Sequence, residues 1–252
     1  MKSSSKVMKG IFWSAVASAT WGISGTTIQF ISQNQHIPTD WFLSTRTLGS
    51  GTILLIISFI LYGKKTFNVF STWKSFGHLF AYATLGLMAN LLTFYLAIQI
   101  GNASAATILQ YLSPLFIVLG GIFIKHQRPL STDLIAFIIS LLGVLLAITK
   151  GDLTQMSIPM NSFLWGLGSG ITAAFYVVLP RPIAQDNPPL VVLGWGTFIA
   201  GVLFNLYHPV WINTPHITST VVLSISTVIL VGTIIPFGLL LYSSRFAPRS
   251  EE

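Results

Sequence analysis

The stretch LGLMANLLTFYLAIQIGNASAATILQYLSPLFIVLGGIFIK, residues 85–125, decides the fold class. Two long apolar runs meet at Gly101-Asn102, and no charged residue occurs before the closing Lys125. At about 1.5 Å of rise per residue, each run can cross a hydrocarbon core about 30 Å thick. Gly and Asn favour tight turns. The stretch therefore predicts a transmembrane helical hairpin.

Uncharged polar residues interrupt both runs at helical spacing. Gly86, Asn90 and Thr93 are three or four residues apart and share one helix face, and Gln110 and Pro114 do the same in the second run. Lipid offers no hydrogen-bond partners, so such side chains face other helices or a wet cavity. Two interpretations are open: a solute site, or contacts between helices, which small and weakly polar residues commonly line.

Composition extends this interpretation to the whole chain. Of its 252 residues, 52% are hydrophobic and 8% are charged, whereas an average soluble domain carries roughly 25% charged residues. This predicts an all-α polytopic membrane protein whose main partner is the lipid bilayer. The net charge of +7 comes without a basic face bearing stacking aromatics, so no nucleic acid is expected. The chain has no cysteine, which excludes disulfides and thiolate metal sites.

Eight apolar runs are candidate transmembrane helices. They cover residues 10–31, 41–62, 76–100, 103–124, 134–149, 162–179, 190–207 and 219–246. With the N-terminus inside, every Lys and Arg outside these runs falls in an inside loop except Lys150. Because basic residues are retained on the cytoplasmic side, the pattern predicts a multi-pass cell-membrane protein with both termini cytoplasmic.

The N-terminus has a second interpretation. Three lysines before an apolar run, followed by Ala17-Ser18-Ala19, imitate a cleavable signal peptide. The apolar character continues to Ile31, which favours a span that is retained.

Two pairs of similar segments predict an internal repeat. GIFWSAVASATWGISG at 10–25 is similar to NSFLWGLGSGITAAF at 161–175, and 86–104 aligns with 232–250 at a constant separation of 146 residues. Because each repeat has an odd number of helices, the second copy crosses the membrane in the opposite orientation to the first, as in many secondary transporters. We therefore expect two inverted five-helix repeats, at 1–150 and 151–252, with only three helices present in the second.

Three features carry a family resemblance: a first helix rich in small residues around Trp21, Arg46 in the second helix, and the hairpin sequence YLAIQIGNASAATILQYLSPLF at 95–116. With them the whole chain resembles the EamA-type permeases of the drug/metabolite transporter superfamily. The resemblance implies a ten-helix fold of two inverted repeats around a central cavity.

The chain departs from that family pattern in two places. The junction after the fourth run reads Ile-Lys-His-Gln-Arg at 124–128, without the usual Gly-Glu pair, and the chain ends before a ninth and a tenth helix. We expect one wall of the cavity to be missing, and a homodimer would restore it.

Acidic residues are confined to loops and the tail: Asp40, Asp133, Asp152, Asp186, Glu251 and Glu252. No carboxylate lies within a predicted span, so neither carboxylate-based proton coupling nor a metal site is expected. No HExxH motif or Ser/His/Asp set is present, and we expect no catalytic residues, no cofactor and no enzyme activity.

The predicted solute site takes mid-span polar and aromatic residues: Trp21, Asn90, Gln110, Tyr111 and Tyr176. Apart from Arg245 at the very end of the last run, Arg46 is the only charge within a predicted span. Three roles are open for it: snorkelling to the surface, bonding to helix carbonyls, or binding an anion. Pro114 and Pro236 are expected to break helix hydrogen bonding and free carbonyls near the midplane.

Together these patterns predict a permease for small metabolites, such as amino acids or related compounds. Its two repeats would give alternating access to a midplane cavity. Two alternatives are a truncated remnant that does not transport and a membrane sensor that binds a ligand without moving it. The substrate and the direction of transport are open.

Overall fold

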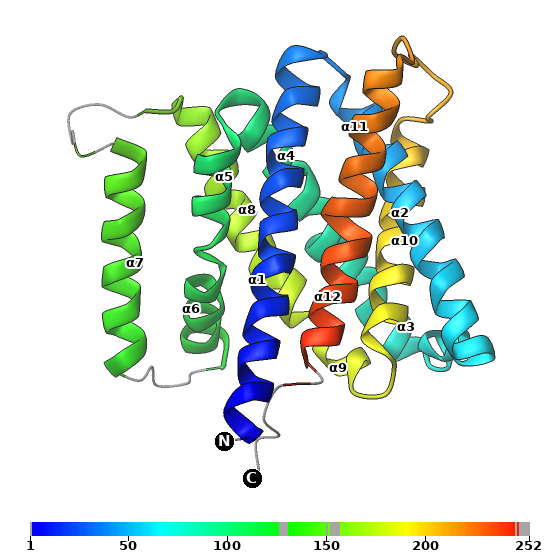
Figure 1. Cartoon of the computed structure of the whole chain (residues 1–252), viewed down its shortest axis with the longest axis horizontal. Helices are drawn as coiled ribbons and strands as arrows, with labels where there is room; N and C mark the ends of the chain where they lie inside the picture. Colours follow the sequence, from blue (N-terminus) through cyan, green and yellow to red (C-terminus); the bar gives the residue numbers. More distant parts are fainter. Residues whose placement is uncertain (1, 126–130, 150, 152–156, 245, 247–252) are drawn as a thin grey trace.

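The computed structural model describes residues 2–125, 131–149, 151, 157–244 and 246. Within these ranges the secondary structure is helical without strands, which confirms the all-α part of the predicted fold class (Figure 1). Part of the junction at 124–128, Lys150, Asp152 and the two terminal glutamates lie outside the described residues.

The helical segments follow one another with short connections. In chain order they are α1 (Lys2–Gln29), η1 (Phe30–Asn34), α2 (Thr39–Tyr62), η2 (Gly63–Phe70), α3 (Trp73–Ala81), η3 (Tyr82–Met88), α4 (Ala89–Ile100), α5 (Ala103–Gln110), α6 (Ser113–Lys125), α7 (Ser131–Thr149), α8 (Met160–Val178), α9 (Arg181–Ala184), α10 (Pro189–Tyr207), α11 (Ser219–Ile229), η4 (Leu230–Ile234) and α12 (Ile235–Ser244). The η2 segment is a tight 3₁₀ helix, and η1, η3 and η4 are wider π-helical turns.

Six helical segments of the described chain are long and apolar enough to cross a membrane. They are Thr39–Phe70, Trp73–Ile100, Ala103–Phe123, Met160–Ala184, Pro189–Tyr207 and Ser219–Leu240. The helices predicted at 10–31 and 134–149 are present as α1 and α7, outside those six. The turn predicted at Gly101 and Asn102 is also present, because the Asn102 side chain caps α5 by accepting a hydrogen bond from the Ala105 N–H at 2.8 Å.

Helices α2 and α10 pack closely against each other. A Cβ atom on Gly51 of α2 would lie 2.6 Å from the backbone N of Phe198, and one on Gly201 of α10 would lie 2.6 Å from the backbone N of Leu48. Because glycine leaves room for a facing backbone, this pair lets the helices approach more closely than side chains normally allow.

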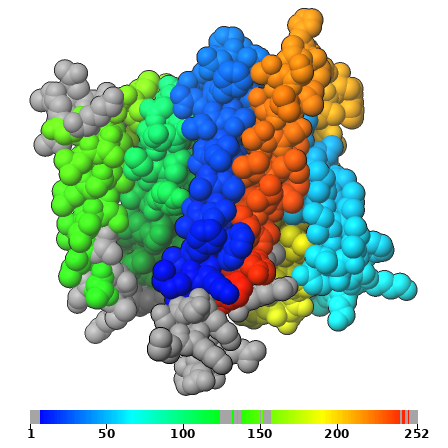
Figure 2. Space-filling view, viewed as in Figure 1, coloured from blue at the N-terminus to red at the C-terminus, as the bar shows by residue number. Residues whose placement is uncertain are grey.

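Two further crossings flank this pair. Helix α8 packs on η3 and α4, where the backbone of Tyr176 lies against Gly86; a Cβ there would be 3.1 Å from the Tyr176 Cα. Helix α1 packs on η4 and α12, where the side chain of Ser24 lies against Gly232. In Figure 2, α1 runs beside α11 and α12 on one face of the molecule.

The apolar core is divided along the length of the bundle. One cluster joins the C-terminal half of α1 to the start of α2, to α4 and to α11 around Phe42 and Tyr95, whose rings lie 5.1 Å apart. A second joins α2, η3 and α10 around Leu54 and Tyr82, near the end of the bundle where α9 lies and α1 begins (Figure 1). The two clusters therefore lie toward different ends of the helix bundle.

Candidate functional site

A cavity of about 240 Å³ opens near α9. Three aromatic side chains from different helices meet in it: Tyr82 of η3, Tyr176 of α8 and Phe237 of α12. The ring centroids of Tyr82 and Tyr176 are 5.7 Å apart, and those of Tyr176 and Phe237 are 6.4 Å apart. The rest of the lining is apolar: Val177, Pro180, Ala184, Pro189, Leu190, Val192 and Leu193. The cavity suits the apolar or aromatic part of a small solute.

Trp21 of α1 lies next to this cavity. Its indole N–H donates to the carbonyl of Gly232 at 3.1 Å, and its ring stacks edge-on against Phe237 with centroids 5.6 Å apart. The structure thus brings two of the predicted site residues, Trp21 and Tyr176, to the same aromatic group. Pro236 precedes Phe237 in α12, directly after the π-helical turn η4.

Asn90 and Gln110 meet each other in a polar cluster between α4, α5 and α8. The Asn90 amide donates to the Ser169 carbonyl at 3.0 Å and to the Thr172 hydroxyl at 3.2 Å, and the Gln110 amide donates to the Asn90 side-chain oxygen at 3.2 Å. The Thr93 hydroxyl lies 3.2 Å from that of Thr172. These amides join helices in this conformation, and neither residue lines the aromatic cavity.

Removing one member of this cluster is expected to destabilise the fold. Asn90→Leu leaves the Gln110 amide without its partner on α4, at a cost of about 1–3 kcal/mol. The double variant Asn90→Leu/Gln110→Leu should recover part of that loss, since neither amide remains unpaired. Thermal unfolding followed by tryptophan fluorescence measures both. An Asn90→Leu protein of unchanged stability that no longer transports would instead place Asn90 in the solute site.

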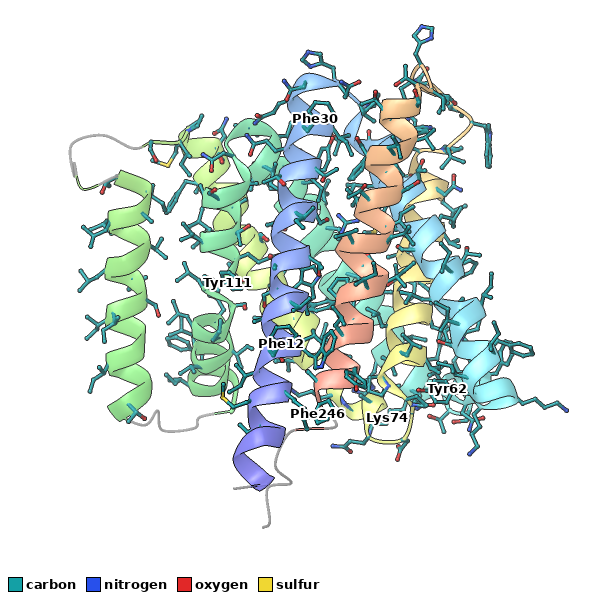
Figure 3. The ribbon with its side chains drawn as sticks, viewed as in Figure 1. Phe12, Phe30, Tyr62, Lys74, Tyr111 and Phe246 are labelled. Atoms are coloured by element: carbon teal, nitrogen blue, oxygen red, sulfur yellow. The ribbon has the colours of Figure 1, made fainter. Side chains whose placement is uncertain are left out.

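Tyr111 stands apart from the other predicted site residues. It lies at the junction of α5 and α6 with 66% of its surface exposed, at mid-height of the bundle (Figure 3). The helix is interrupted there: α5 ends at Gln110, and α6 begins at Ser113, next to Pro114.

Arg46 lies in the first third of the 24-residue helix α2 and is 8% exposed. Among the described residues its guanidinium takes part in no hydrogen bond or ion pair. It comes four residues after Phe42, which packs on Tyr95 of α4, and three before Gly49, which faces Ile229 of α11.

The end of the bundle opposite the cavity is held together by side-chain amides. Gln33 of η1 reaches the carbonyl oxygens of Ile98, Gln99 and Gly101 at 3.0, 3.3 and 2.9 Å. The neighbouring Gln29 accepts from the Ala103 N–H at 2.9 Å. These bonds fasten the end of α1 to the turn between α4 and α5.

The start of α2 is fastened in the same way to the segment after α10. The Trp41 indole donates to the Val210 carbonyl at 2.8 Å, and the Ser44 hydroxyl donates to the His208 carbonyl at 2.9 Å. Together with the core around Phe42 and Tyr95, these contacts seal this end in the present conformation.

Sequence reasoning missed Tyr82, Phe237 and Gln33. Tyr82 and Phe237 lie in apolar runs, where an aromatic residue gives no signal beyond hydrophobicity. The one signal for Phe237 was its position after Pro236. Gln33 lies two residues beyond the end of a predicted span, so it resembles an ordinary loop residue. The described residues contain no group of His, Asp and Glu that could hold a metal ion.

Comparison with known proteins agrees with this architecture. The sequence profile of the EamA-like transporter family matches residues 8–149. The chain belongs to this family. It is 30% identical over 237 residues to the uncharacterized inner membrane transporter YicL of Salmonella typhimurium, an alignment that covers 94% of this chain and 79% of that protein.

The EamA-like fold also has a counterpart among solved structures. A crystal structure of a protein described without a function superposes with a TM-score of 0.60 at 18% identity, covering 96% of this chain and 78% of its own. This likeness concerns the fold. The family match and the YicL-like relative identify this EamA-family chain as a multi-pass membrane transporter.

Proposed function

We propose that this EamA-family protein is a permease that moves small metabolites by alternating access. The observation that carries the proposal is the asymmetry of the bundle: a 240 Å³ aromatic cavity opens near α9, while Gln33 and its neighbours seal the opposite end. A protein that opens one end at a time moves solute without forming a continuous pore.

The proposed mechanism depends on an inverted repeat within a fold of eight transmembrane helices. Helix α2 aligns with α10 at a constant separation of 150 residues, which pairs Pro38 with Pro188, Thr47 with Thr197 and Gly51 with Gly201. The two prolines have nearly the same backbone angles, φ −57° and ψ 132° against φ −56° and ψ 134°. The same alignment pairs Leu48 with Phe198. The contact of Gly51 with Phe198 in one repeat therefore corresponds to the contact of Gly201 with Leu48 in the other.

The flanking crossings follow the same relation. A separation of 146 residues pairs Gly86 with Gly232 in the sequence alignment. It also aligns residues 84–88 of η3 with η4, so a π-helical turn occurs at the same position of both repeats. Aligning Trp13 with Trp165 pairs Ser24 with Tyr176, and these are the residues that meet Gly232 and Gly86. The profile match at 8–149 supports a first repeat at 1–150 and a second from 151. Two similar halves can exchange conformations, which is the basis of alternating access.

The distribution of basic residues indicates which side of the membrane the cavity faces. Lys74 and Arg181 lie in segments at the end of the bundle where the cavity opens, together with η2, which carries Lys64 and Lys65 (Figure 3). Since basic residues are retained in the cytoplasm, the proposed orientation places this end and both termini inside. The cavity then faces the cytoplasm.

Filling the cavity is expected to stop transport. Ala184→Trp adds an indole to the lining and should lower the uptake of labelled metabolites into proteoliposomes at least about tenfold, because it occupies space that the solute needs. Val202→Trp introduces the same group on the exposed side of α10 and serves as the control. Equal flux in both variants with unchanged stability would show that solute does not pass through this cavity.

A further inference from the structure

Arg46 is a charge without a partner in the described part of the protein. It lies within an apolar helix and is 8% exposed. No carboxylate of the described residues pairs with it. In apolar surroundings a cation costs several kcal/mol unless a counter-charge and hydrogen bonds compensate. The unpaired guanidinium therefore calls for an anion.

The side chain faces the interior of the bundle. Helix α10 packs on the face of α2 formed by Thr47, Leu48 and Gly51. At 100° per residue, Arg46 lies well away from that face and on the side shared by Phe42 and Gly49. These residues face Tyr95 of α4 and Ile229 of α11, so Arg46 is directed between those helices.

We propose that Arg46 binds the carboxylate of the transported metabolite, which narrows the substrate class to small monocarboxylates with an apolar or aromatic body. This inference rests on the proposed transport function. A guanidinium binds a carboxylate through two parallel hydrogen bonds and neutralises its single charge. Among the six candidate spans, the one carboxylate of the described residues is Asp40, in the first turn of α2. The middle of these spans therefore offers no carboxylate to a second, cationic group on the solute.

The net charge of the solute distinguishes small monocarboxylates from other candidate substrates. One arginine neutralises one negative charge, so a phosphate dianion would enter the apolar interior with charge remaining. A zwitterionic amino acid would bring an ammonium group, and the only carboxylate in the described candidate spans, Asp40, lies at the very start of α2 rather than in the middle of a span. The aromatic cavity around Tyr82 and Tyr176 suits the uncharged remainder of the solute.

The test compares an acid with its neutral amide. Purified protein in proteoliposomes is given labelled N-acetylphenylalanine or N-acetylphenylalaninamide, which differ only in the carboxylate. We expect the acid to be taken up at least about tenfold faster than the amide, and Arg46→Met to abolish this preference by slowing only the acid. Arg46→Lys, which keeps the charge but loses the two-pronged geometry, should retain part of the uptake of the acid.

Lys74→Met is the matched control, because it removes one exposed positive charge with the same replacement residue. It should leave both probes unaffected. Thermal unfolding without solute adds a second readout: Arg46→Met should unfold at the same temperature as the wild type or higher, since an unpaired buried charge is gone.

The outcomes separate the two proposals. If the wild type takes up neither probe above protein-free vesicles, both transport through this site and the role of Arg46 are contradicted. If it takes up acid and amide alike and Arg46→Met changes nothing, transport stands and the carboxylate role is wrong. If Arg46→Met lowers stability and slows both probes together, Arg46 is structural and the inference is wrong.

Discussion

Gly51→Ala is expected to destabilise the protein by about 1–3 kcal/mol, the cost of overpacking a close contact. The new Cβ would lie 2.6 Å from both the N and the Cα of Phe198, and backbone atoms cannot rotate away as a side chain can. The α2–α10 crossing must therefore widen. In a chain of this size each kcal/mol shifts the melting temperature by roughly 2–4 °C, which a thermal scan in detergent resolves.

Gly77→Ala is the matched control for this prediction. Gly77 lies in α3 and is exposed, and a Cβ atom added to it would meet nothing within 4 Å. There the same substitution should leave stability unchanged or raise it by up to about 1 kcal/mol, because alanine favours the helix. An equal loss in both variants would mean that Gly51 does not permit the close approach. Gly201→Ala should behave like Gly51→Ala, since it meets the backbone of Leu48.

Gln33→Leu is expected to open the sealed end. It removes contacts with the carbonyls of Ile98, Gln99 and Gly101, and each net hydrogen bond contributes about 1 kcal/mol. A loss of about 1.4 kcal/mol from the sealed state raises the open population tenfold. The natural chain lacks cysteine, so one introduced thiol reports this opening without background.

Ala103→Cys is the reporter, because Ala103 is 6% exposed next to the Gln29 contact. A membrane-impermeant maleimide should label it about tenfold faster when Gln33→Leu is present. Ile217→Cys, exposed in the segment before α11, should react equally fast with and without Gln33→Leu. Unchanged labelling of Ala103→Cys would show that Gln33 does not hold this end closed.

Several features of the fold were predictable because each depends on a short stretch of chain. Apolar runs predict helices in a membrane whatever their neighbours are, and Asn102 caps the helix that follows it through a local hydrogen bond. The family was recognisable for the same reason, since each of its features lies within a single helix or one helical hairpin. The π-helical turns at η3 and η4 were not predicted, although they occupy aligned positions of the proposed repeat.

The candidate site was less predictable, because polarity shows that a side chain needs a partner without showing which one. Asn90 and Gln110 were expected to line a cavity or to join helices, and in this conformation they bond to each other and to α8. Tyr111 was grouped with them by its position in the chain, yet it is 66% exposed. Their roles in transport remain predictions.

The sequence by itself determined that this is a helical membrane protein of the EamA-like family, because hydrophobicity, helix length and turn residues act locally and lipid accepts few alternatives. Only the tertiary structure decided where Tyr82, Tyr176 and Phe237 meet, which end is sealed, and that Arg46 is buried. Those features depend on the rotation of each helix about its own axis. Close crossings such as Gly51 with Phe198 set that rotation, and they join residues far apart in the chain.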